Sequence, residues 1–183
     1  MKPLHGLLRT WGFGLAAALG VVAWQLALRW LVAPSYSFAV YALLCACAFP
    51  VAVAPSLRAA ALSLALSLPL AMCAALVAPD AATLVLCAAL IAALGRASLY
   101  RAGLARTLCV ELALLGLGFA AARLFGGTGP FGLALGLWSY CLVQGLFFLL
   151  LAPEPRAKAA AAAGDPFDAA HQRALGLLAK REL

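Results

Sequence analysis

The stretch FGLALGLWSYCLVQGLFFLLLA, residues 131–152, decides the fold class of this chain. It contains no charged side chain and is dominated by leucine, phenylalanine and glycine. A helix needs about 20 consecutive, predominantly apolar residues to cross the ~30 Å hydrocarbon core of a bilayer. Residues 131–152 meet that requirement, so the stretch predicts a helix that spans a membrane.

Five further apolar segments precede it with very short connections. The six predicted spans are, to within a few residues, 11–33, 36–54, 59–78, 81–100, 104–122 and 131–152. The whole chain is 67% hydrophobic and 10% charged, whereas a soluble domain has about 45–50% apolar and 25% charged residues. Small apolar residues outnumber β-branched ones, which favours close-packed helices over a membrane barrel. We predict an all-α, polytopic membrane protein with six transmembrane helices.

The last part of the chain has a different character. Residues 153–164 form a linker rich in proline and alanine, and residues 165–183 read as a short amphipathic helix with Asp165 as its N-cap. We expect this helix to be cytoplasmic and to dock into a partner protein, or alternatively to lie on the membrane surface. Its candidate partner or lipid contacts are Phe167, Leu178, Lys180 and Arg181.

The distribution of basic residues predicts the orientation. Six spans place both termini on one side of the membrane. If that side is the cytoplasm, only Arg29 and Arg123 of the 13 lysines and arginines lie outside, as the positive-inside rule favours. The basic residues, which give the chain a net charge of +7, are therefore expected to contact anionic lipid head groups. Nucleic-acid binding is not expected, because no basic patch is interleaved with aromatic residues.

Arg96, Arg101 and Arg106 fall in the predicted cytoplasmic loop between the fourth and fifth spans. We interpret them as topological anchors that contact lipid head groups, or alternatively as a docking surface for a partner. Their five-residue spacing would scatter them around a helix, so they would not form a single stripe. Arg96 is expected near the end of the 81–100 helix, with its side chain reaching the interface.

Glu111 is the candidate for an intramembrane polar site. A carboxylate within a spanning helix is costly and by default a functional candidate. We expect it about one turn inside the cytoplasmic end, where it pairs with Arg106 or another loop arginine. If the last two spans pack antiparallel, Gln144 is its best neighbour by depth. Gln25 is a further candidate, through a hydrogen bond to another helix. Two roles stay open for Glu111: structural pairing, and the coupling of protons or substrate.

The glycines and cysteines carry less information. Gly132 and Gly136 have the small-xxx-small spacing that brings helices close together, within the chain or across an interface. The six cysteines contain no CxxC pair and have no histidine nearby, so we interpret them as small buried apolar residues. Haem, zinc and other metal sites lack their ligands, and no cofactor is expected.

These features point away from an enzyme, because no predicted span contains a histidine, an aspartate or a nucleophile paired with a base. We predict a non-enzymatic subunit or scaffold of a membrane complex that docks other subunits through glycine-lined helix faces and its cytoplasmic tail. A homo-oligomer is also open. The alternative is a small-molecule binding or transport component with Glu111 as its coupling or ligand group. The bias toward Ala, Leu, Gly and Arg indicates a bacterial inner-membrane protein.

The outline of six spans with both termini inside resembles two bacterial classes in architecture alone. One is the substrate-binding subunit of energy-coupling-factor transporters, and the other is the shape-determining protein MreD. The first resemblance implies the binding of a small molecule. No motif of this chain matches either class, so the sequence assigns no family.

Overall fold

The computed structural model describes residues 3–28, 30–101, 104–151 and 154–155. In this part of the chain the long helices are α1 (Pro3–Leu28), α2 (Pro34–Val53), α3 (Leu57–Val77), α4 (Ala81–Leu99), α5 (Leu104–Phe125) and α6 (Pro130–Gly145). A short α7 (Phe147–Leu150) continues α6, and β1 (Tyr100–Arg101) pairs antiparallel with β2 (Glu154–Pro155). Six helical segments are long and apolar enough to cross a membrane. The prediction of six candidate membrane spans in a helical chain is confirmed.

The bounds of four spans agree with the sequence prediction to within one turn, but the first and last differ. The first helix begins at Pro3 rather than residue 11 and ends at Leu28 rather than residue 33. The prediction followed the apolar run, whereas the backbone is already helical in the basic segment before it. The predicted continuous helix 131–152 is interrupted, because α6 ends at Gly145 and α7 resumes at Phe147.

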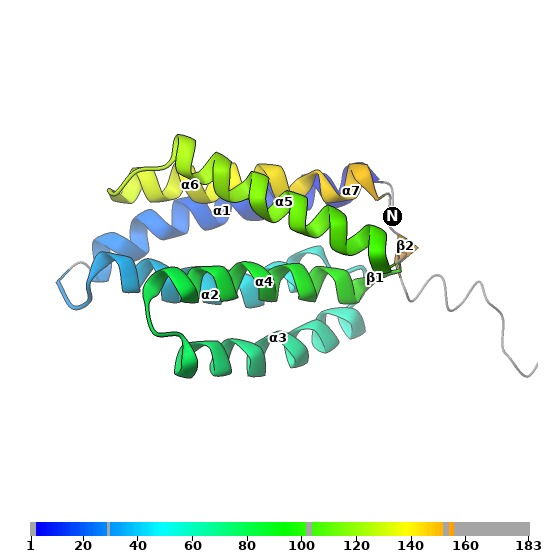
Figure 1. Cartoon of the computed structure of the whole chain (residues 1–183), viewed down its shortest axis with the longest axis horizontal. Coiled ribbons are helices and arrows are strands. Elements are labelled where there is room, and N and C mark those ends of the chain that lie inside the picture. Colours follow the sequence, from blue (N-terminus) through cyan, green and yellow to red (C-terminus); the bar gives the residue numbers. More distant parts are fainter. Residues whose placement is uncertain (1–2, 29, 102–103, 152–153, 156–183) are drawn as a thin grey trace, which may run out of the picture.

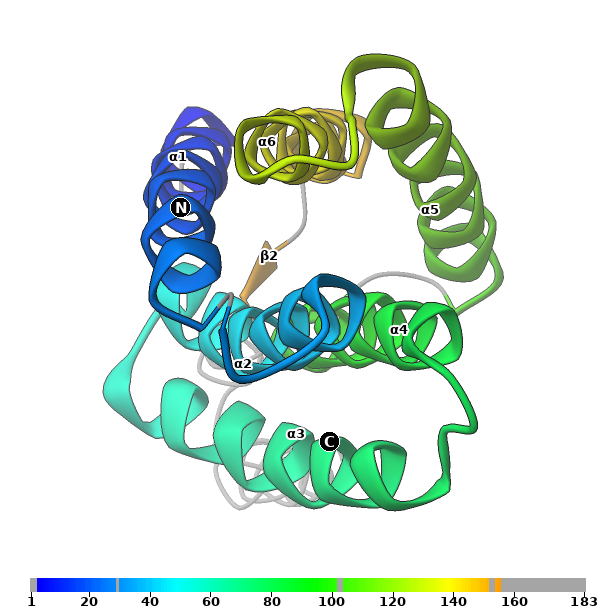
Figure 2. The same ribbon diagram turned by 90° about the vertical axis from the view of Figure 1, so that its left-hand side faces the viewer.

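The helices form three layers (Figures 1 and 2). The first layer contains α1, α6 and α5, with α6 packed between the other two, and the second contains α2 and α4. The third layer is α3 alone, which covers the outer side of α2 and α4. Because α4 and α5 contact each other little, the first two layers diverge on the side where these helices face each other.

The start of α1 and the short helix α7 lie together at one end of the bundle. Gly6 near the start of α1 packs against Phe148 in α7. We call this the termini end; α2 and α4 end there, and α3 and α5 begin there. The opposite end, where α2, α4 and α6 begin, is the far end. The six-span topology therefore brings the first and last helices to one side of the bundle, whereas the tail at 165–183 lies outside the described residues.

Glycine brings α1 and α6 into close contact. A Cβ atom on Gly145 would lie 2.6 Å from Nε1 of Trp11, and one on Gly14 would collide with the side chain of Cys141. Trp11 Nε1 also donates a hydrogen bond of 3.3 Å to the Leu142 carbonyl. These glycine faces, which the sequence offered as docking surfaces for other subunits, are covered by helices of the same chain.

The small-xxx-small pair of α6 is also used internally. Gly132 packs against the backbone of Gly127, and Gly136 lies against Gly126 and the Ala122 carbonyl at the end of α5. The pair therefore closes the tight α5–α6 turn. Of the two contacts that the sequence allowed, within the chain or across an interface, the structure has the one within the chain.

The close contact between α2 and α4 sets the position of Arg96 in α4. A Cβ atom on Gly95 would collide with the ring of Pro50 in α2, so only glycine permits this approach. Pro50 lies within α2, whose helix continues to Val53. The two helices are also joined by a cluster of mostly small side chains that includes Ala39, Ala46 and Ala88. The close approach brings Arg96, the neighbour of Gly95, into the interior of the bundle.

Candidate functional site

Arg96 is the centre of a buried polar cluster between α4, α5 and α6. Its side chain is completely buried. Nε donates to Oε1 of Glu111 at 3.1 Å, and Nη2 donates to Oε2 of the same carboxylate. Nη2 also donates to Oε1 of Gln144 at 2.8 Å, and Nη1 donates to the Gln144 carbonyl at 2.8 Å. The fork of the guanidinium thus matches the carboxylate with two parallel bonds.

The position of Arg96 differs from the sequence prediction, which placed it near the interface as a lipid or partner contact. Cβ atoms point toward the N-terminus of a helix, and for α4 that direction leads away from the termini end. The side chain therefore extends inward. In the structure it contacts neither solvent nor the outer surface of the bundle.

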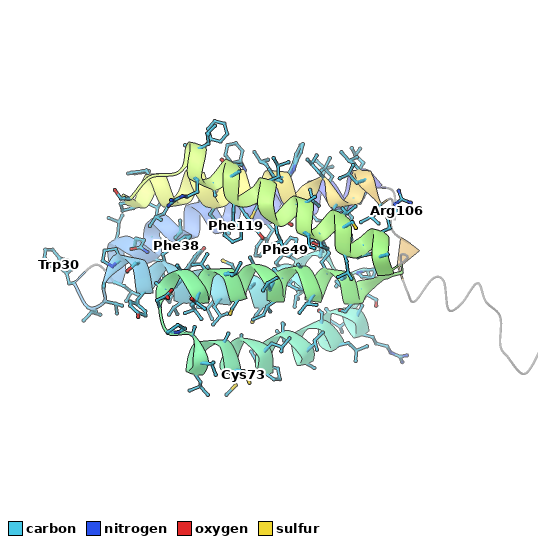
Figure 3. All side chains as sticks on the ribbon, in the orientation of Figure 1. Trp30, Phe38, Phe49, Cys73, Arg106 and Phe119 are labelled. Atoms are coloured by element: carbon cyan, nitrogen blue, oxygen red, sulfur yellow. The ribbon has the colours of Figure 1, made fainter. Side chains whose placement is uncertain are left out.

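Glu111 and Gln144 meet as the sequence proposed, but through Arg96. The sequence expected Glu111 to pair with Arg106 or another arginine of the predicted loop, which included Arg96, and Arg96 is the partner. Arg106 instead donates to the Leu150 carbonyl at 3.0 Å, at the termini end (Figure 3). Because Glu111 has only 5% of its surface exposed, the carboxylate is held inside the bundle and does not reach the interface.

Gln144 is positioned by the interruption between α6 and α7. The Leu146 amide turns back to the Val143 and Gln144 carbonyls, and the Gln144 carbonyl accepts the Arg96 Nη1 bond as well. The side-chain Nε2 donates to the Leu114 carbonyl in α5 at 3.0 Å. Gln144 therefore joins all three helices and leaves no polar atom of its amide group unpaired.

Aromatic rings flank the guanidinium on its apolar sides. The Arg96 Cζ atom lies 4.2 Å from the centroid of the Phe147 ring and 5.8 Å from that of Phe49. Such distances allow cation–π attraction, which strengthens when the cation is desolvated. Phe49 and Phe147 belong to an apolar cluster with Val53, Leu99 and Phe148. This cluster separates the polar groups from the termini end.

A cavity of about 620 Å³ lies on the other side of Arg96. It is bounded by α1, α2, α4, α5 and α6, and its wall contains mainly aromatic side chains and alanines. Phe38 and Phe119, from opposite layers, lie in the space between the layers, and Phe49 lies nearer the termini end (Figure 3). The volume is within the ~300–1,000 Å³ range of small-molecule sites in proteins.

The charged and amide groups of the cavity lie at its two ends. Arg96 and Gln144 form its floor, toward the termini end, and Arg123 and Thr128 lie at the far end. Glu111 does not line the cavity, because it lies behind Arg96. The carboxylate thus holds the guanidinium in place, and the buried side chains of Arg96 and Gln144 close this end of the cavity.

The other predicted residues are spread around the bundle. Gln25 is buried, but it donates to the Pro34 carbonyl at the start of α2 at 3.2 Å and is not part of the Arg96 cluster. Arg101 lies in β1, and only its backbone is described. The predicted tail contacts lie outside the described residues: Phe167, Leu178, Lys180 and Arg181.

Sequence reasoning missed the cavity and the aromatic residues that surround it. Phe13, Phe38 and Phe49 are single residues in apolar runs, so nothing distinguishes them in the sequence from lipid-facing phenylalanines. Among the residues described here, no three His, Cys, Asp or Glu side chains gather as a metal site would require. Comparison with protein-family models, curated proteins and solved structures finds no match to this chain.

Proposed function

We propose that this chain is a membrane-embedded binding protein, of the kind that serves transport, for a small molecule with a largely apolar body. The observation that carries the proposal is the 620 Å³ cavity, closed at one end by a buried, hydrogen-bonded polar cluster. A bundle that served only as a scaffold would not require such a space, because protein interiors are otherwise packed to crystal-like density.

The arrangement of α4 and α5 supports entry from the bilayer. These two helices both line the cavity, yet they contact each other little. The wall of the cavity is therefore thinnest on a side that faces lipid in a spanning bundle. An apolar ligand already dissolved in the membrane would enter there without crossing water.

The charged residues at the two ends support an orientation with the termini end in the cytoplasm, while the bacterial inner membrane stays a prediction from composition. Arg9, Arg58 and Arg106 are exposed at the termini end, and Arg9 donates to the Ala54 carbonyl there. At the far end, Arg123 is the exposed arginine of the described helices. In intact cells, an impermeant thiol reagent should label Asp80→Cys but not Arg58→Cys; the reverse pattern would reject this orientation.

The subunit function predicted from the sequence stays a prediction. Its glycine-face component loses support, because Gly14, Gly132, Gly136 and Gly145 contact other parts of this chain. Its other component, the tail at 165–183, lies outside the described residues. The role of Glu111 also changes in the binding proposal. The sequence suggested a ligand or coupling group, whereas here Glu111 is the group that holds Arg96.

The test is native mass spectrometry of the full chain with two matched variants. Ala89 in α4 lines the cavity, whereas its neighbour Leu90 is exposed on the outside of the same helix. We expect the wild type and Leu90→Phe to retain a bound small molecule or to take up added apolar ligands. Ala89→Phe should fold, as judged by circular dichroism, but should lose that binding because the ring fills the cavity. Equal binding by all three proteins would reject the cavity as the site.

A further inference from the structure

The two arginines of the cavity differ in their surroundings. Arg96 at the floor is buried, and its charge is offset by Glu111. Arg123 at the far end is exposed, and no acidic side chain of the described residues lies within ion-pair distance of it. The lining of the floor therefore has no net charge, whereas the lining at the far end carries the positive charge of Arg123. Asp80, the acidic residue at that end of the bundle, does not line the cavity and forms no ion pair with Arg123.

From this difference we infer that the ligand is an anionic amphiphile with a single hydrocarbon chain, bound with its acidic head group at Arg123 and its chain running toward Arg96. The inference rests on the proposed binding function and specifies its ligand class. It uses three features of the cavity, namely the charge at each end, the composition of the wall and the length.

Electrostatics favours a ligand with its acidic group at Arg123 over one with its acidic group at Arg96. An acidic group at the floor would add a net negative charge to a site away from water, and an uncompensated buried charge is costly. The same group beside Arg123 would be paired and partly hydrated.

The wall between the two ends suits a hydrocarbon chain. Its residues from α1, α2 and α4 include Phe13, Phe38, Ala42, Val85 and Ala89, and none of the charged side chains lies between Arg123 and Arg96. Tyr140, Cys45 and Cys141 are the more polar members of the wall. They carry no charge in their ordinary protonation state at neutral pH.

The dimensions fit one extended chain. The lining of α6 extends from Gly132 to Gln144, which is about 18 Å at a rise of ~1.5 Å per residue. One leaflet of the hydrocarbon core is roughly 15 Å thick, so a membrane acyl chain would span this length. The length of the cavity therefore matches that of a single acyl chain.

The acidic group could be a carboxylate or a phosphate, since Arg123 would pair with either. The experiment therefore uses palmitate, palmitoyl lysophosphatidic acid and the neutral monopalmitoylglycerol, which carry the same acyl chain. Binding of each is measured by native mass spectrometry on the delipidated full-length protein in a nonionic detergent. The variants are Arg123→Gln, Arg123→Lys and Ala89→Phe, with Arg58→Gln as the control for an exposed arginine away from the cavity.

We expect at least one acidic ligand to bind about fivefold or more tightly than monopalmitoylglycerol, in keeping with roughly 1 kcal/mol for a basic side chain near a membrane surface. The tighter of the two acids identifies the head group. Arg123→Gln should remove this preference, while Arg123→Lys and Arg58→Gln should keep it.

Two other results would have distinct meanings. If all three ligands bind equally and Ala89→Phe abolishes their binding, the anionic ligand class is wrong and the proposed binding function stands. If none of them binds, or if Ala89→Phe has no effect, both the ligand class and the cavity function are rejected. A preference for acids that persists in Arg123→Gln would overturn the role of Arg123.

Discussion

Arg96 in α4 and Glu111 in α5 form a bidentate ion pair across two helices that otherwise contact each other little. The side chains are 1% and 7% exposed, so the pair is shielded from water as well as from lipid. A single charge in this position would be strongly unfavourable in a membrane. The ion pair therefore joins α4 to α5, and it also makes the burial of both charges possible.

Removing one partner of this pair should destabilise the protein strongly. We expect Glu111→Leu or Arg96→Leu to lower the free energy of unfolding by about 3–5 kcal/mol, because each leaves an uncompensated buried charge. The double variant Arg96→Leu/Glu111→Leu should cost clearly less than the sum of the two single changes. Unfolding in SDS, monitored by tryptophan fluorescence, measures all three values. Additive effects would show that the two charges are not coupled.

The close contact between α1 and α6 requires glycine at position 14 but not at position 12, two residues earlier. Gly14 lies against Cys141, so Gly14→Ala should cost about 1–3 kcal/mol through overpacking. Gly12 has open space around it, so Gly12→Ala should be neutral or stabilise the helix by up to about 1 kcal/mol. The same SDS titration compares the two variants. If Gly14→Ala is as stable as Gly12→Ala, the helices do not approach as closely as described.

Asp80 should make a small, acid-sensitive contribution at the far end. The Thr83 amide donates to Oδ1 at 2.7 Å, and its hydroxyl donates to Oδ2 at 3.2 Å. These bonds, the amide bond first, lower the pKa of the Asp80 carboxyl below its ordinary value near 3.8. The folded state therefore favours the ionised form. The stabilisation is complete above the ordinary pKa and is lost as the pH falls through the lowered one.

The comparison variant is Asp80→Asn, because asparagine also caps a helix but does not titrate. We expect the difference in Tm between the wild type and Asp80→Asn to be constant above about pH 5 and to shift against the wild type below about pH 4. The difference isolates Asp80 from other groups that titrate in acid. Parallel Tm curves from pH 3 to pH 6 would mean that the cap bond does not favour the ionised form.

The subunit prediction can be tested independently of the cavity. If the tail docks a partner, deletion of residues 165–183 should leave membrane insertion and Tm unchanged but remove co-purifying proteins. Ala89→Phe serves as the matched control, because it alters the cavity and leaves the tail intact. Retention of the same proteins at wild-type stoichiometry by the truncated chain would reject the tail as a docking element.

Part of the candidate site was accessible from sequence. A carboxylate in an apolar run is conspicuous, so Glu111 could be singled out, and helix order placed Gln144 at a comparable depth. The sequence offered the loop arginines as partners of Glu111 but could not choose among them, because Arg96 lies close enough to a helix end to reach either the interface or the interior. The choice depends on the rotation of α4 and on the Gly95–Pro50 contact, which no local pattern encodes.

The sequence by itself determined the helical class and the six candidate spans, because the length of an apolar run must match the thickness of the bilayer. It also determined which end of the bundle is rich in basic residues. Only the tertiary structure decided that the glycines are used within the chain, that Arg96 turns inward and that a cavity remains between the layers. These features depend on which faces of distant helices meet, and an apolar side chain looks the same in sequence whether it faces lipid, another helix or an empty space.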